Sequence, residues 1–585
     1  MVRSLYSLLT ASERRTAFVL LGLMSAAALL ETLGVGIVVP ALAILAQEDP
    51  AARYPALRAV LNLGGGLTRP QLMAVGMLTL AAVYLIKAVF VTFVIWRQNI
   101  FVFALQARLS QRLFRVYLCQ PYTFHLQRNS AQLIRNAVTE VTEFTFSGMI
   151  PGMLLLSECL VLAGITALLL AVQPVGALIV GTSLGAGAWA LRRATQGPIA
   201  AWGAARPHHD GMRIQHLQQG LGGAKEVKLL GREEDFLAQY RIHTLASARF
   251  GAVHLTLLEL PRLGLELLGV VGLAALVLTM LAQGRDMTGA VLILGLFAAA
   301  AFRLMPSVNR IVNSWQRLLY IAPVVKSLHA ELTLPSPDPV KGAAHSTSFH
   351  TDVTLRDVSF TYPSAPRPAL EGVCVVVRKN ESVGLVGPSG SGKSTLVDVI
   401  LGLLSPDAGQ VLVDGADIHE NLRGWQNQVG YVPQSIYLTD DSFRRNVAFG
   451  LAAEDIDDGA VQRAIKAAQL EEFVASLPDG LETLVGERGV RLSGGQRQRI
   501  GIARALYHDP SVLVLDEATS ALDTATESLV MEEVMALRRS KTILVVAHRL
   551  STVEHCDRLY RLERGRVIAE GASADMVRIG QVGNV

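Results

Sequence analysis

The first 335 residues of the chain contain apolar runs long enough to cross a lipid bilayer, and these runs constrain the fold most strongly. A membrane-spanning helix needs about 20 apolar residues. Six segments approach or exceed that length: 16–46, 71–96, 144–172, 174–195, 252–283 and 289–314. Only 17% of the chain is charged, compared with about 25% in soluble domains. The sequence therefore predicts an α-helical membrane domain of about six transmembrane helices over residues 1–330.

Basic residues set the expected orientation of these helices, because cytoplasmic loops of membrane proteins are enriched in Lys and Arg. The loops after the second and fourth spans contain many basic residues, whereas the turn after the third span has no charge. The turn after the fifth span carries only Arg285 and Asp286. The first span is too long for the apolar region of a signal peptide. We therefore expect a multi-pass protein whose N-terminus, long loops and C-terminal half face the cytoplasm.

Composition changes near residue 335, within a Pro- and Ser-rich linker predicted over residues 331–351. Over residues 352–585, short β-branched runs alternate with helical patterns, which is typical of a parallel α/β domain. The net charge of +4 is small for this length and does not indicate nucleic-acid binding. The four cysteines show no metal-ligand or disulfide spacing.

The segment SVGLVGPSGSGKST contains the pattern G-x-x-x-x-G-K-S between a β-rich run and a helical pattern. This strand–loop–helix context is that of a phosphate-binding loop, in which backbone N–H groups and a helix N-terminus surround the phosphates. Lys393 is predicted to reach the outer phosphates, and Ser394 to ligate Mg²⁺. The predicted nucleotide-binding residues of this loop are Gly387, Ser389, Gly390, Gly392, Lys393, Ser394 and Thr395.

Two further segments complete the predicted site. The apolar strand VLVLDE ends in two acids, of which Asp516 is predicted to hold Mg²⁺ and Glu517 to act as general base on the attacking water. A purely structural role would leave unpaired buried charges, which is costly. The segment LSGGQRQR places Ser493, Gly494 and Gly495 at a helix start, where a hydroxyl and backbone N–H groups can bind a second anion.

The order GPSGSGKST, YVPQ, LSGGQ, VLVLDEATSALD and AHRL resembles that of ATP-binding-cassette proteins, over about residues 352–575. The resemblance implies that Tyr362 stacks on adenine, that Gln434 contacts Mg²⁺ and water, and that His548 contacts the γ-phosphate. It also implies a head-to-tail dimer in which Asp523 links the two sites. The residues expected to close over ATP on the partner chain are Ser493, Gly494, Gly495 and Gln496. A homodimer would then hold two competent sites.

A membrane domain before a single cassette resembles a type IV ABC exporter half-transporter. Residues 220–236 resemble the second inner loop of such exporters, which docks into the cassette, and residues 486–489 resemble the element that meets these loops. The expected fold is therefore an α-helical membrane domain plus an α/β P-loop nucleotide-binding domain, assembled as a homodimer.

Basic residues inside the spans are the main sequence signal for cargo, because a charge in hydrocarbon is costly and usually functional. Counting residues along the helices places four of them near the inner leaflet: Lys87, Arg262, Arg303 and Arg310. Such a basic belt would suit a phosphate-bearing head group. Two structural alternatives remain open. Some of these side chains could extend to the inner head groups, or Glu31, Glu259 and Glu266 could neutralise them as ion pairs.

The segments ETLGVGIVVPALAIL, ELPRLGLELLG and RLMPSVNRIVNSWQRLLY resemble bacterial flippases of lipid-linked oligosaccharides used in protein N-glycosylation. So does the outer segment 51–66, for which a short amphipathic helix or an ordinary loop is expected. Lys87 keeps the charge but loses the bidentate geometry of the arginine expected at its position.

The resemblance implies ATP- and Mg²⁺-dependent flipping of polyprenyl-pyrophosphate-linked oligosaccharides. The expected direction is from the cytoplasmic to the outer leaflet of a bacterial inner membrane. One alternative is an exporter of lipid A, other lipids or hydrophobic drugs, with neutralised charges and a more apolar cavity. The other is a membrane-anchored ATPase that regulates without transporting.

Overall fold

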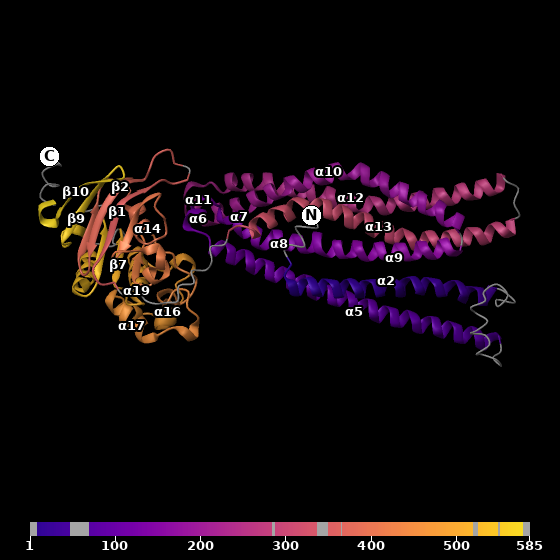
Figure 1. Ribbon diagram of the computed structural model, residues 1–585, viewed down its shortest axis with the longest axis horizontal. Coiled ribbons are helices and arrows are strands. Elements are labelled where there is room, and N and C mark those ends of the chain that lie inside the picture. Colours follow the sequence, from indigo (N-terminus) through magenta and orange to yellow (C-terminus); the bar gives the residue numbers. More distant parts are fainter. Residues whose placement is uncertain are drawn as a thin grey trace. The chain divides into compact units, whose positions relative to one another are not determined.

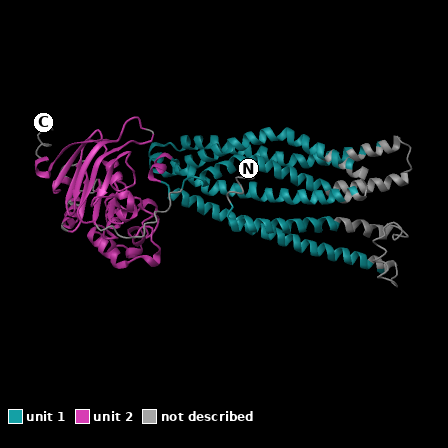
Figure 2. Cartoon of the chain, in the orientation of Figure 1, with its two compact units in different colours: residues 1–120, 128–336 teal, residues 121–127, 337–585 magenta. Residues whose placement is uncertain are grey.

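A computed structural model describes residues 9–46, 69–172, 174–282, 287–335, 349–363, 365–518, 524–547 and 550–576. The chain forms two compact units, which Figure 2 colours separately: a helical unit of residues 1–120 and 128–336, and a sheet unit of residues 121–127 and 337–585. The main division falls inside the predicted linker. Residues 121–127, which the sequence places in the first domain, group with the sheet unit instead. The outer segment 51–66 lies outside the described residues.

Long helices lie over the described part of all six predicted spans, except that the third span begins with the π-helical segment η2 (Phe144–Met149). They are α2 (Ala11–Ala46), α5 (Arg69–Leu118), α9 (Ile150–Val172), α10 (Pro174–Gly222), α12 (Glu233–Ala282) and α13 (Met287–Leu332). In the described part of the chain, Ala11–Gly34, Ala74–Leu118 and Ser130–Ala167 are long and apolar enough to cross a membrane. The predicted helical membrane domain is therefore confirmed.

Several of these helices are much longer than a bilayer requires. Helix α12 has 50 residues, or about 75 Å at 1.5 Å per residue, whereas the hydrocarbon core is about 30 Å thick. Figure 1 shows the long helices of this unit running side by side. Shorter elements connect them: α7 (Ser130–Arg135), η1 (Asn136–Glu140), α8 (Val141–Glu143), η2 (Phe144–Met149) and α11 (Ala224–Leu230). The segments η1 and η2 are π-helical.

Apolar packing holds this bundle together. Val161, Ile165, Leu265 and Leu304 form a buried cluster shared by α9, α12 and α13. Helix α10 approaches α13 very closely at Gly203, where a Cβ atom would collide with the main-chain carbonyl of the residue it faces. Because a collision with backbone cannot be relieved by a rotamer change, this contact requires glycine.

The sheet unit contains two sheets. The first is antiparallel, in the order β2 (Leu370–Arg378), β1 (Asp352–Phe360), β4 (Ala408–Val413), β5 (Ala416–Asp417). The second has the order β10 (Arg566–Ala572), β9 (Arg558–Glu563), β3 (Ser382–Val386), β8 (Thr542–Val546), β7 (Val512–Asp516), β6 (Val429–Val432). All of its pairings are parallel except β10 with β9. Strands β7 and β8 are buried throughout, as expected when helices cover both faces of a parallel sheet. The predicted α/β domain is confirmed.

Helices and short turns surround the sheets. The α-helices of this unit are α6 (Tyr122–Gln127), α14 (Lys393–Ile400), α15 (Leu422–Gln426), α16 (Phe443–Val447), α17 (Asp458–Ala467), α18 (Glu471–Ala475), α19 (Gly494–Leu506), α20 (Thr524–Ala536) and α21 (Leu550–Val553). The 3₁₀ turns are η3 (Ile418–Asn421), η4 (Ala453–Asp455), η5 (Gly480–Glu482), η6 (Glu487–Gly489) and η7 (Leu537–Arg539). Trp425 of α15 is buried, and its indole N–H donates to the carbonyl of Ile400 at 2.7 Å.

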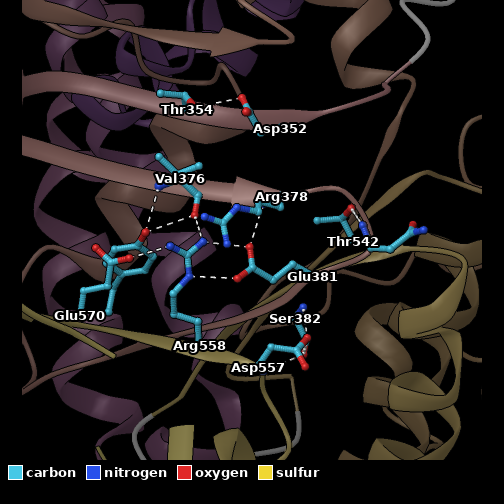
Figure 3. A network of polar contacts seen from close by, with 12 residues as sticks. Asp352, Thr354, Val376, Arg378, Glu381, Ser382, Thr542, Asp557, Arg558 and Glu570 are labelled. Carbon is cyan, nitrogen blue, oxygen red and sulfur yellow. Dashed lines mark hydrogen bonds and ion pairs between the residues drawn. The ribbon is translucent and has the colours of Figure 1, made fainter. Parts of the chain in front are cut away.

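A polar network joins the two sheets (Figure 3). Arg558, at the start of β9, donates to the Glu381 carboxylate at 2.9 Å, to Glu570 at 2.6 Å and to the Val376 carbonyl of β2 at 2.6 Å. The side chains of Arg558 and Glu381 are only 14% and 13% exposed. One guanidinium group therefore satisfies acceptors from three separate segments.

Replacing Arg558 with Met is expected to destabilise the sheet unit, because Glu381 would remain half-buried without its cation. Removing one partner of a buried pair costs about 3–5 kcal/mol. Because both side chains keep partial access to solvent, we expect the free energy of unfolding to fall by about 2 kcal/mol. The unfolding midpoint should then fall by about 5 °C. Scanning calorimetry of the full-length protein in detergent would measure this. Arg566→Met, which breaks an exposed pair with Glu371, is the matched control and should change the midpoint little. Equal effects of the two substitutions would refute the structural role of Arg558.

Candidate functional site

The predicted phosphate-binding loop connects β3 to α14, and its glycines are required by its geometry. Gly392 has φ +103°, a conformation that favours glycine, and a Cβ there would lie 2.7 Å from the Ala369 carbonyl oxygen. At Gly387 a Cβ would collide with the Leu562 carbonyl. Gly390 is also left-handed, at φ +76°. Successive turns of this kind direct backbone N–H groups into a concave anion site at the start of α14.

Lys393 begins α14 and is 5% exposed. Its ammonium group donates to the carbonyls of Gly387 at 2.9 Å and Pro388 at 3.0 Å. Burial lowers the pKa of Lys393, and the nearby carboxylates of Glu517 and Asp516 partly oppose that shift. The loop, the cation and the two predicted acids thus form one site.

Tyr362 also lies at this loop, because its hydroxyl is 3.1 Å from the Thr395 hydroxyl. The ring of Tyr362 packs edge-on against Phe360, with centroids 5.0 Å apart. Ser389 is on the exposed part of the loop, and Ser394 is exposed on the first turn of α14. The Tyr362 ring and the hydroxyl groups of Ser389 and Ser394 therefore lie at the same edge of the sheet.

The two predicted acids lie at the end of β7, at the same edge: Asp516 is its last residue and Glu517 follows it. Asp516 is buried, whereas Glu517 is half-buried and has φ +48°, a conformation uncommon for a residue with a Cβ. The Glu517 carboxylate accepts a hydrogen bond from the Gln434 side-chain amide at 2.7 Å. Because β6 and β7 are parallel neighbours, the residues after both strands lie at the same carboxyl edge, where α/β sheets bind ligands.

Sequence reasoning did not assign two residues that the structure adds to this site. Asp398 of α14 is half-buried, and burial together with Asp516 raises its pKa to about 6. The Tyr431 hydroxyl donates to Asp516 at 3.5 Å, and burial raises the pKa of this phenol. The sequence signal for Asp398 was a single carboxylate in the otherwise apolar helix LVDVILGLL. For Tyr431 it was the position of this polar aromatic residue in the YVPQ segment, which also contains Gln434.

Helix α6, which groups with the sheet unit, approaches the same residues. Burial raises the pKa of Tyr122, and the charges of Asp398 and Tyr362 add to the shift. A segment of the first inner loop therefore lies beside the residue expected to stack on adenine. The sequence predicted long cytoplasmic helices here but not this placement.

The predicted signature segment caps a helix. Ser493 is the N-cap of α19: its hydroxyl accepts from the Gln496 N–H at 3.1 Å, and the Gln496 side chain accepts from the Ser493 N–H at 2.8 Å. Gly494 and Gly495 form the first turn. The capping box fixes the helix start, and glycines there leave the backbone accessible to an anion. Asp523 and His548 lie outside the described residues, so their roles remain predictions.

Two of the predicted substrate-binding cations form interhelical ion pairs. Lys87 of α5 lies 3.4 Å from Glu31 of α2. Arg310 of α13 lies 2.6 Å from Glu158 of α9, whose side chain is only 9% exposed. Lys87 therefore pairs with Glu31, one of the acids that the sequence offered as a neutralising partner. For Arg310 the partner is Glu158, an acid that the sequence did not single out.

Arg262 pairs within its own helix. Its guanidinium lies 3.1 Å from Glu266, one turn further along α12, and both side chains are more than half exposed. The side chain of Arg303 lies outside the described residues. Each of the described cations of the predicted belt therefore has a carboxylate partner.

An apolar cavity lies between α2, α5, α9 and α13 of the helical unit. Its volume is about 860 Å³, within the range of ligand-binding pockets. Aromatic residues that line it include Phe18, Phe101, Phe144 and Trp315, and Arg14 is the charged residue in its described lining. The lining of this cavity is therefore almost entirely apolar.

Comparisons with known proteins agree with this geometry. Residues 370–520 match the ABC transporter family. An ATP-dependent lipid A-core flippase from Chromobacterium violaceum is 30% identical over 547 residues, which cover 92% of each chain. A protein of the same name from Xanthomonas campestris pv. campestris is 35% identical over 372 residues, or 63% of this chain and 62% of the relative.

A solved structure shares the whole fold. The structure of a bacterial Atm1-family ABC exporter with ATP bound has a TM-score of 0.77 and 24% identity, covering 98% of this chain and 97% of the other. At that identity the likeness concerns the fold. The relative that is 30% identical over 92% of each chain shows the family. The chain belongs to the ABC transporters, in the exporter family that includes the ATP-dependent lipid A-core flippases, and it couples ATP hydrolysis to transport.

Proposed function

We propose that the protein is a homodimeric lipid flippase that moves lipid A, or a similar lipid with several acyl chains, across a bacterial inner membrane. The direction is from the cytoplasmic to the outer leaflet. The single observation that carries the choice of cargo is the near full-length similarity to proteins named lipid A-core flippases. This proposal replaces the oligosaccharide flippase, the first expectation from sequence.

Two features of the helical unit support this cargo. The apolar cavity of about 860 Å³ offers hydrocarbon contacts over almost its whole lining. Lys87, Arg262 and Arg310 each pair with a carboxylate, which weakens the argument for a basic belt that binds pyrophosphate. Neutralised charges and an apolar cavity are the pattern expected for a lipid exporter.

The proposed reaction uses the carboxyl edge of the second sheet. Asp516, the Ser394 hydroxyl and the Gln434 side-chain oxygen are hard oxygen ligands of the kind that Mg²⁺ prefers. The Gln434 amide N–H group donates to Glu517, which leaves its oxygen for the metal. When bound, Mg²⁺ would neutralise phosphate charge. Lys393 and the loop N–H groups hold the phosphates, and Glu517 orients and deprotonates the attacking water.

The second inner loop is the proposed coupling element. Helix α11 ends at Leu230 and is capped by Gly231, which has φ +62°. Its last residues, Leu229 and Leu230, are 81% and 68% exposed. Exposed leucines at the tip of a long helical hairpin suit an apolar docking contact. We propose that this tip docks into a cassette and transmits the nucleotide cycle to the membrane helices.

Stimulation of ATP hydrolysis by candidate cargoes tests the proposal. Purified protein in liposomes is assayed with lipid A, with a polyprenyl-pyrophosphate oligosaccharide and with hydrophobic drugs. We expect lipid A to raise turnover several-fold and to appear in the outer leaflet in an ATP-dependent assay. Stimulation by the oligosaccharide alone would reject the lipid A proposal in favour of the other flippase. A protein that hydrolyses ATP but moves no cargo would support a regulator.

A further inference from the structure

A second, polar cavity in the helical unit shares no lining residue with the nucleotide site or with the apolar cavity. Its volume is about 550 Å³, within the range of small-molecule sites. Residues from η1, α8 and η2 line one wall, and residues from α10, α12 and α13 line the others. The cavity lies near the cytoplasmic ends of four predicted spans, where a site can be reached from both the aqueous phase and the inner head groups.

The first wall consists of three polar residues. Thr139, Glu143 and Ser147 follow one another at intervals of four residues and all line the cavity. The segments η1 and η2 on either side of α8 are π-helical, and π-helical turns occur often at functional sites. The wider turn brings residues four apart onto one face, so a hydroxyl, a carboxylate and a hydroxyl face the same space.

Both acids in the lining already have cationic partners. Glu143 lies 2.9 Å from Arg206, and Asp210 lies 2.9 Å from Arg206 and 3.2 Å from Arg213. Asp210 also accepts from the Ser247 hydroxyl at 2.7 Å. The acceptor capacity of the acids is therefore used by groups that belong to the wall.

Two donors in the same lining have no such partner among the described residues. Arg317 of α13 forms no ion pair and no hydrogen bond with any residue that the structure describes. His254 of α12 is 7% exposed, and its Nδ1 atom is buried without a hydrogen-bond partner. The imidazole stacks on Tyr320, with centroids 3.9 Å apart and planes at 11°, so the ring cannot turn away without losing that contact. Because Nδ1 has almost no accessible surface, a ligand in the cavity would meet the other ring nitrogen of His254, Nε2.

The charges of the lining do not cancel. Arg206, Arg213 and Arg317 contribute three positive charges against two from Glu143 and Asp210, which leaves +1 with His254 neutral. Guanidinium groups bind phosphate oxygens through two parallel hydrogen bonds, and a neutral imidazole can donate one more. The lining therefore offers the excess positive charge and the donor groups that an oxyanion requires.

We propose that this cavity binds a phosphate-type anion, with Arg317 as the principal cation and His254 and Thr139 as further donors. The inference goes beyond the proposed transport function and holds whichever lipid is carried. The anion can come from the phosphate head group of an inner-leaflet lipid or from a soluble phosphate compound. Both have the same chemistry at the site, and the experiment separates them.

Native mass spectrometry of the full-length protein in detergent provides the test. In one arm the probe is phosphatidic acid, with phosphatidylcholine as the zwitterionic comparison. In the other it is inorganic pyrophosphate, with the nucleotide sites saturated by a non-hydrolysable ATP analogue. We expect at least one anionic probe to bind the wild-type protein, and Arg317→Gln to weaken that probe about ten-fold or more, because a charge-assisted hydrogen bond is lost.

Two further variants make the result specific. Arg249→Gln removes an exposed arginine of α12 that does not line the cavity, and it should bind both probes as the wild type does. His254→Phe keeps the stack on Tyr320 but removes the nitrogen atoms, and it should weaken binding several-fold while basal ATP hydrolysis persists. Binding of phosphatidic acid alone identifies a lipid site, and binding of pyrophosphate alone identifies a soluble ligand. The proposal is overturned if neither probe binds, or if Arg317→Gln and Arg249→Gln behave alike.

Discussion

Replacing Glu517 with Gln is expected to abolish ATP hydrolysis while leaving ATP bound. The carboxylate follows β7 next to buried Asp516 and accepts a hydrogen bond from Gln434 at 2.7 Å, so it is placed to receive a proton from water at the γ-phosphate. An amide of the same size cannot accept that proton, and general-base catalysis contributes about 10²–10⁴-fold. We therefore expect turnover to fall by about 10²-fold or more, measured as phosphate release in liposomes.

A control variant at another glutamate and a nucleotide-binding assay make the Glu517→Gln result specific. Glu533 is an exposed carboxylate on α20, and Glu533→Gln should hydrolyse ATP at the wild-type rate. A fluorescent ATP analogue should bind both variants with similar affinity, because Lys393 and the loop backbone are unchanged. Near-normal turnover of Glu517→Gln would remove this residue from the role of base. Loss of nucleotide binding would instead show that the Glu517 carboxylate helps to hold the nucleotide, and the loss of turnover could then not be assigned to a missing base.

The nucleotide site could be predicted from sequence because its chemistry is local. Gly387 to Ser394 lie within one strand–loop–helix unit, and the backbone of that unit brings them together whatever surrounds it. Asp516 and Glu517 are far from the loop in sequence. However, the loop follows β3 and the two acids lie at the end of β7, and the carboxyl ends of buried parallel strands share one edge of the sheet. Residue type and strand periodicity were therefore sufficient to predict which residues form the nucleotide site.

The ion pairs formed by charged residues in the membrane helices could be predicted only in part. Helical periodicity identifies the face on which Lys87 or Arg310 lies, but not which of several acids at similar depth is its partner. The sequence placed Glu31 among the possible partners of the belt and did not single out Glu158, because the choice depends on how α9 packs against α13. The π-helical turns of η1 and η2 were also beyond reach, since a few residues cannot distinguish that period from an α-helix.

Each ATP site of the proposed homodimer is expected to be completed by residues from both chains. If Ser493 of one chain closes over ATP held by Lys393 of another, the site is shared between chains. Lys393→Ala removes the cation that holds the phosphates, and Ser493→Arg places bulk at the helix cap that should meet them. Each substitution in a homodimer is expected to reduce hydrolysis by about 10²-fold or more, as the loss of a group that stabilises transition-state charge does.

Mixed dimers, purified through two different tags, then distinguish shared sites from sites within one chain. A dimer of Lys393→Ala with Ser493→Arg has one intact site if sites are shared, because the unaltered loop of one chain meets the unaltered cap of the other. A dimer of wild type with the double variant carries the same two substitutions but has no intact shared site. We expect measurable hydrolysis from the first dimer and almost none from the second. The reverse order would show that each chain completes its own site, and the head-to-tail homodimer would have to be abandoned.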